Sequence, residues 1–165
     1  MDNATIQIMI NTTHDILGKL TILKHNASGN LIDQRVTHNS ITTAGRQLVA
    51  DLFTFNINGD KEDKIKRISK MHLGGSQAPF NAAHKGLLDE IGQTDIISFE
   101  PVPTGNDRIQ IRIVGELGTD DCNGELKEAG LFTDGAQPIM YNRVTFDTIT
   151  KSQEFKLTLI WDLTF

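Results

Sequence analysis

Alternation of apolar and polar side chains is the dominant pattern of this chain, and it is clearest at the C-terminal end. From Phe155 to Phe165 every second residue is apolar, and polar residues such as Lys156 and Asp162 lie between them. Successive side chains of a strand point to opposite faces, so this spacing predicts a strand with one face in a core and the other in solvent. The same period of two predicts half-buried strands at 6–10 and 109–113.

Other segments are less regular, but they are rich in β-branched and aromatic residues and are bounded by turn residues, which also predicts strands. Two turn sequences, Asn26–Asn30 and Asp120–Gly124, supply residues that tolerate positive φ. We therefore expect each of them to join its flanking strands as a hairpin. The less regular strand segments are 19–24, 31–38, 64–73, 95–102, 124–133 and 138–148.

One segment has the spacing of a helix. Thr42 or Thr43 can cap the run 44–53, whose apolar residues form a stripe along one helical face. A shorter helical turn is expected at 86–91, after an irregular stretch at 74–85. Loops as long as 74–85 are often the parts of a domain that contact partners.

The order of these elements predicts the fold class. Many short strands with few helical crossovers indicate an all-β fold, and we expect an antiparallel β-sandwich of the jelly-roll type with one short helix. A chain of 165 residues is long enough for one domain with its own core. Residues 21–165 are expected to form that domain, and residues 1–20 to be either an added strand or an arm that docks on a neighbour.

Composition and charge argue against several classes of function. The net charge is −5, with 16 basic and 21 acidic residues and no long block of either sign, so a nucleic-acid partner is not expected. Cys122 is the sole cysteine, which rules out a disulfide within the chain. The first twenty residues have no basic start and no continuous apolar core, so we expect neither a signal peptide nor a membrane span.

The sequence predicts no catalytic, cofactor-binding or metal-ligating residues. It has no Gly-rich phosphate loop and no Gly-x-Ser-x-Gly sequence, and its five histidines are scattered. Residues 119–130 resemble a calcium loop at Asp121 and Asn123, but the first and twelfth ligand positions are Thr119 and Gly130. A plain turn is therefore favoured over a calcium site.

Several short sequences follow one another in an order that identifies a family resemblance. This order resembles that of a widespread group of small bacteriophage structural proteins, including tail-fibre attachment, baseplate and collar components. The resemblance covers roughly residues 31–165, and it implies a virion protein with a β-sandwich fold and no catalytic residues. The sequences that carry it are Asn39–Arg46, Ile68–Gly75, Gly86–Ile91, Gly124–Phe132, Met140–Phe146 and Ile160–Phe165.

Glu128 and Gly130, which lie in one of these shared sequences, are candidates for structural or interface roles. The Glu128 carboxylate is expected to accept N–H groups from the 39–45 turn, or to pair with Arg46 or Arg143. The alternative is a strand carboxylate that faces solvent. Gly130 is expected to allow a bulge or a close approach of backbone.

Two aromatic residues are further candidates. Phe80 lies in the irregular stretch 74–85 and is expected to be buried between subunits or against a neighbouring virion protein. The alternative is that it packs against its own domain. Trp161 falls in phase with the core face of its strand. Because the chain has one Trp and one Tyr, few aromatic side chains then remain for stacking on sugars.

These observations lead to one hypothesis of function and its alternatives. The chain is interpreted as a non-enzymatic subunit of a phage tail, collar, baseplate or fibre anchor, synthesised in the host cytoplasm and incorporated into the virion. Its expected partners are copies of itself and neighbouring virion proteins, with no cofactor, nucleic acid or membrane. A capsid decoration or head-fibre protein is the alternative within this class, and a carbohydrate-binding jelly-roll module is the alternative outside it.

Overall fold

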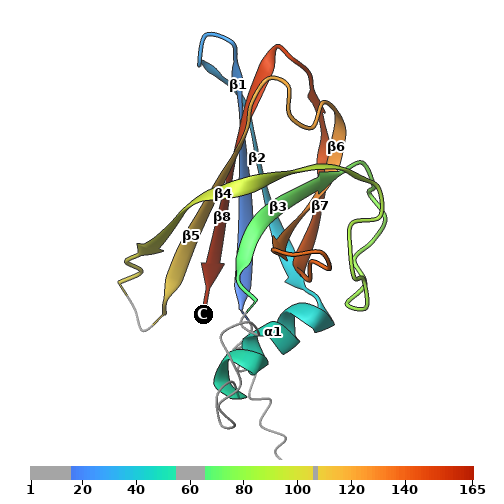
Figure 1. Ribbon diagram of the computed structural model, residues 1–165. Coiled ribbons are helices and arrows are strands. Elements are labelled where there is room, and N and C mark those ends of the chain that lie inside the picture. Colours follow the sequence, from blue (N-terminus) through green and yellow to red (C-terminus); the bar gives the residue numbers. More distant parts are fainter. Residues whose placement is uncertain (1–15, 55–65, 106–107) are drawn as a thin grey trace, which may run out of the picture.

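The computed structural model describes residues 16–54, 66–105 and 108–165, which form eight antiparallel strands and one helix (Figure 1). The expected all-β antiparallel class with one helix is confirmed. The strand predicted at 6–10 lies outside the described residues. The elements are β1 (Leu17–Asn26), β2 (Leu31–Ile41), α1 (Thr43–Thr54), β3 (Ile68–Gly74), β4 (Glu90–Val102), β5 (Gln110–Leu117), β6 (Gly124–Thr133), β7 (Met140–Lys151) and β8 (Phe155–Thr164).

The strands close into a barrel in the order β1-β2-β7-β6-β3-β4-β5-β8. The predicted β-sandwich is therefore corrected to an eight-stranded barrel. Closure depends on two long strands that change neighbours along their length. The first part of β4 pairs with β3 and the part from Ile96 onward pairs with β5, whereas β2 pairs with β1 and reaches β7 only at Ser40 and Ile41.

The two predicted hairpins have different outcomes. Asn26–Asn30 does connect the paired strands β1 and β2, with Gly29 at a φ of 82°. The turn at Asp120–Gly124 connects β5 to β6, which are not neighbours in the barrel, so the hairpin predicted there is wrong. The physical reason is that β4 and β8 occupy both edges of β5, which leaves no edge for β6.

The helix α1 lies at one end of the barrel, below the strands in Figure 1. Of the two threonines considered as its cap, Thr42 is the one whose hydroxyl accepts the Gly45 N–H, at 2.9 Å. Gly45 is required by packing, because a Cβ atom there would lie 2.0 Å from the carbonyl oxygen of Tyr141 on β7. The close approach of α1 to β7 fixes the helix against the end of the barrel.

Alternate residues of most strands point into the barrel, and their side chains form its core. Leu20, Ile22 and Trp161 are fully or almost fully buried, in agreement with the predicted phase of the C-terminal strand. Burying a large aliphatic side chain contributes about 1.5–3 kcal/mol. The Trp161 indole N–H donates to the Asn39 side-chain oxygen at 2.7 Å, so its one polar atom is also satisfied inside the barrel.

Candidate functional site

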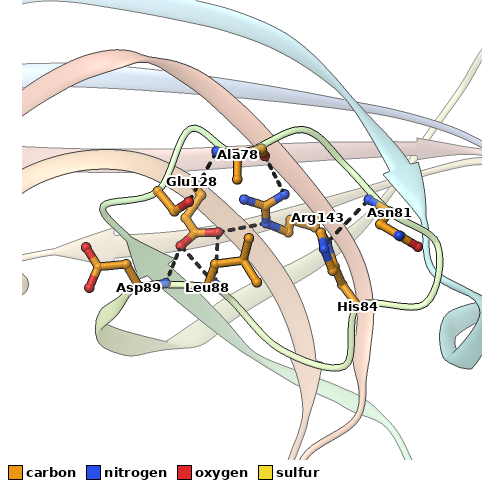
Figure 2. Close-up of polar contacts among 8 residues, drawn as sticks. Ala78, Asn81, His84, Leu88, Asp89, Glu128 and Arg143 are labelled. Atoms are coloured by element: carbon orange, nitrogen blue, oxygen red, sulfur yellow. Dashed lines mark hydrogen bonds and ion pairs between the residues drawn. The ribbon is translucent and has the colours of Figure 1, made fainter.

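Residues 75–89, which we term the strap, lie across the outer wall formed by β6 and β7 (Figure 1). The helical turn predicted at 86–91 is not formed, and β4 begins at Glu90. A buried ion pair beneath the strap explains its shape. Arg143 Nε donates to Glu128 Oε2 at 2.7 Å, and neither side chain is exposed (Figure 2).

This ion pair holds the strap near both of its ends. Glu128 Oε1 accepts the N–H groups of Asp89 and Leu88 at 2.9 and 3.1 Å, and a guanidinium N–H of Arg143 donates to the Ala78 carbonyl at 2.9 Å (Figure 2). The ion pair therefore determines the path of the strap. Glu90 and Ile91 belong to β4, where Glu90 pairs with Gly74 of β3, so the end of the segment predicted as a helical turn is extended strand.

The structure separates the alternatives that the sequence left open for Glu128. Arg143 is its ion-pair partner, and the backbone N–H groups that it accepts come from the strap, whereas the 39–45 turn was expected to supply them. The solvent-facing alternative is wrong because Glu128 has no exposure. Arg46 lies in the first turn of α1, where its N–H donates to the Thr42 carbonyl at 3.0 Å. The Leu88 and Asp89 amides were missed because no side-chain pattern marks them.

Gly130 lies at a tightly packed point of the wall. A Cβ atom at this position would be 2.7 Å from the Asn142 carbonyl oxygen and 2.9 Å from the Phe132 ring. The strap residue Leu87 would be 3.4 Å away. The expected close approach is therefore present, and it comes from the neighbouring strand and from the strap together.

Phe80 lies on the strap and is 36% exposed. Its ring meets His84 edge-on, with centroids 6.4 Å apart. Anchoring of the strap by Glu128 and Arg143 leaves Phe80 partly open to solvent on the outer wall. The structure thus places Phe80 where a neighbouring protein can reach it.

A second feature is an apolar cavity of about 480 Å³ at the end of the barrel next to α1, which we term the mouth. Leu48 and Leu52 of α1 line one side of it. Barrel residues, including Phe99, Ile111, Leu163 and Phe165, line the other. Mouths of β-barrels are common positions for binding sites, and this lining suits apolar groups.

Apolar side chains are also exposed beside the mouth. Phe53, the neighbour of Leu52 on α1, is 85% exposed. Ile109, which precedes β5 and is hydrogen-bonded through its backbone to Phe165, is 67% exposed. The spacing of apolar residues placed Leu52 and Phe53 on the apolar side of the helix, but it did not predict that these side chains are exposed in the described part of the chain. That property depends on where the end of the barrel lies relative to α1.

The turn considered as a calcium loop is organised around a lysine. The Lys151 ammonium is buried and donates to the Thr119 carbonyl at 3.0 Å and the Asn123 side-chain oxygen at 2.9 Å. Burial lowers the pKa of Lys151. Burial, with a smaller contribution from Asp121, raises the pKa of Cys122. In the ranges that the structure describes, no three His, Cys, Asp or Glu residues are grouped to hold a metal ion.

A charged group on the outer wall links three adjacent strands. Asp162 on β8 accepts two hydrogen bonds from the Arg112 guanidinium of β5, at 2.8 and 3.2 Å, and lies 3.5 Å from the Lys19 ammonium of β1. Burial alone acts to raise the pKa of Asp162, but the Arg112 hydrogen bonds and the two positive charges lower it below its ordinary value. These three side chains therefore stabilise the pairing of β8 with β5 and β1.

Comparison of the chain with protein-family models, with curated proteins and with solved structures finds no match. Within the described ranges, no helix has the length and hydrophobicity needed to cross a membrane.

Proposed function

We propose that this chain is a non-enzymatic virion structural protein that assembles as an oligomer in the tail, collar, baseplate or fibre-anchoring region of a phage particle. The observation that carries the proposal is the exposed apolar surface around the mouth. Leu52 and Phe99, which line the apolar cavity, are each more than half exposed, and so is Phe53, the neighbour of Leu52. Apolar side chains that are exposed around a cavity are typical of protein–protein interaction sites.

The charged groups described above support a structural role. Glu128 and Arg143 hold the strap, Lys151 holds a turn, and Asp162 supports three strands. Each of these groups has partners within its own chain. These charged groups stabilise the wall of the barrel, and apolar side chains are exposed at its α1 end. This arrangement is suited to assembly.

The resemblance to phage tail, collar and baseplate proteins supports assembly on a phage particle. A capsid decoration or head-fibre protein would use the same kind of surface and differ only in position on the particle. A carbohydrate-binding module is less well supported, because the one Trp and the one Tyr of the chain, Trp161 and Tyr141, are both buried. Neither ring is available to stack on a sugar.

The proposal is tested with a variant at the mouth. Phe53→Ser should leave the melting temperature nearly unchanged, because this side chain is exposed, and should reduce incorporation into particles. Ile91→Ser, at an exposed apolar position on β4, is the matched control. Incorporation is measured by quantitative mass spectrometry of purified particles, and electron micrographs locate the subunit. Absence of the unmodified protein from the particles would refute the proposal.

A further inference from the structure

One side of β2 has no strand partner over most of its length. The pairing of β2 with β7 is limited to Ser40 with Arg143 and Ile41 with Asn142, whereas its other side pairs with β1 from Leu31 to Asn39. Residues 31–36 are therefore an edge within the described part of the barrel. An edge strand offers backbone N–H and C=O groups to which another strand can add.

Side chains occupy this edge in place of a strand. The Gln34 N–H donates to the Asp33 carboxylate at 2.8 Å, and the Gln34 carbonyl accepts a guanidinium N–H of Arg35 at 3.4 Å. The Thr42 N–H, eight residues further on, points toward β7, where it donates to the Tyr141 carbonyl at 3.0 Å. In a regular strand, even-numbered residues share this direction, so the Gln34 backbone groups face the edge.

The outer face of this edge is apolar. Ile32 and Val36 are 48% and 52% exposed, and both lie on the side of β2 away from the core, with Gln34 between them. A single exposed apolar residue is ordinary on a protein surface, but two on one free edge favour the addition of a strand.

The sequence of the edge is complementary to itself. In an antiparallel pair of β2 strands related by a twofold axis at Gln34, positions equally distant from Gln34 lie opposite each other. Ile32 then meets Val36 of the second copy, and Asp33 meets Arg35 of the second copy. Every such pair occurs twice, and both apolar and opposite-charge pairs across strands are stabilising.

We propose that two copies of this chain associate through their β2 edges, with Gln34 on the twofold axis. The two Gln34 residues exchange backbone hydrogen bonds. Arg35 pairs with Asp33 of its own chain at 2.5 Å, and this pair is replaced by Asp33–Arg35 pairs across the interface. The inference rests on the proposed function of self-assembly and names the surface that performs it. Five residues per copy form a small interface, so the dimer should be weak in solution and strengthened where other contacts hold copies together.

Disulfide trapping tests the register. With Cys122→Ser as background, Gln34→Cys should form an intermolecular disulfide under mild oxidation, because directly opposed residues have Cα atoms about 5.5 Å apart. His38→Cys on the same strand is the control. Its two copies would lie about 27 Å apart at 3.4 Å per residue, so it should not cross-link.

Charge reversal tests the pairing independently. Arg35→Asp should weaken dimerisation by about tenfold or more, measured by sedimentation, because two cross-strand ion pairs become like-charge pairs. Asp33→Arg should weaken it in the same way. An equal mixture of the two variants should restore dimerisation, since each Arg then meets an Asp. Melting temperatures of the separate variants check that both remain folded.

The possible outcomes distinguish a failure of the β2 interface from a failure of the proposed function. If the protein oligomerises and enters particles but Gln34→Cys cross-links no better than His38→Cys, the β2 interface is overturned and the proposed function stands. Failure of the mixed variants to restore association likewise overturns the Asp33–Arg35 pairing. A protein that stays monomeric and is absent from particles removes both.

Discussion

Replacement of Glu128 by alanine is predicted to be severely destabilising. The change leaves the Arg143 guanidinium, which has no exposure, without its counter-charge. Removing one partner of a buried ion pair costs about 3–5 kcal/mol. The Leu88 and Asp89 amides also lose their acceptor. Leu88 is exposed, so the strap can shift to hydrate these amides, and we expect the total to remain about 3–5 kcal/mol.

The free energy of unfolding is measured by urea titration, with circular dichroism as the probe. At roughly 2–4 °C per kcal/mol for a domain of this size, the melting temperature should fall by about 6–20 °C. Glu125→Ala is the matched control on the same strand. Its carboxylate is exposed and pairs with Lys127 at 3.1 Å, so its loss should cost less than about 1 kcal/mol.

A double variant shows how much of the destabilisation comes from leaving the buried Arg143 charge unpaired. Glu128→Leu combined with Arg143→Met removes both charges, so it should be less destabilising than Glu128→Ala. Digestion within the strap should increase in Glu128→Ala, because that variant loses two of the hydrogen bonds that hold it. If the unfolding free energies of Glu128→Ala and Glu125→Ala lie within about 1 kcal/mol of each other, the ion pair does not carry the stability assigned to it.

Three further changes test other parts of the molecule. Trp161→Ala should lower the unfolding free energy by about 3–5 kcal/mol in a urea titration, because it empties the core; unchanged stability would place the ring outside it. Phe80→Ala should leave the melting temperature of the isolated subunit nearly unchanged and abolish incorporation into particles, and an early-melting variant that still assembles would contradict this. Because the pKa of Asp162 is lowered on folding, its contribution is present above the unfolded pKa of about 4 and is lost as the pH falls through the folded pKa. Asp162→Asn should therefore reduce the loss of stability between pH 5 and acid, measured by thermal unfolding at a series of pH values, whereas an unchanged acid profile would show that Arg112 does not hold this carboxylate.

The sequence predicted the strands well where one face of the strand packs in the core and the other faces solvent. The C-terminal strand was expected at 155–165 and is observed at Phe155–Thr164, because burial of alternate side chains is encoded locally. The helix expected at 44–53 agrees with Thr43–Thr54 for a similar reason, since its cap and its apolar stripe lie within the same segment.

Neighbour relations between strands were not encoded locally, and the errors arose there. The chain does turn between β5 and β6, where the Asp121 N–H donates to the Gly118 carbonyl, but a turn does not specify which strands pair, and β5 was already paired on both edges. The wrong prediction at the end of the strap has a similar cause. Residues 86–91 were predicted as a helical turn, yet Glu90 pairs with Gly74 of β3, and the local sequence does not mark this pairing between strands.

The position of β8 has a consequence for how the protein is made. This strand follows all the others along the described chain, yet it lies between β1 and β5 and pairs with each of them along most of its length. Until residues 155–164 have emerged from the ribosome, β1 and β5 each present a bare edge and the core lacks Trp161. Synthesis of this protein therefore passes through an incomplete barrel that is prone to aggregation, and the barrel closes only after β8 has been made.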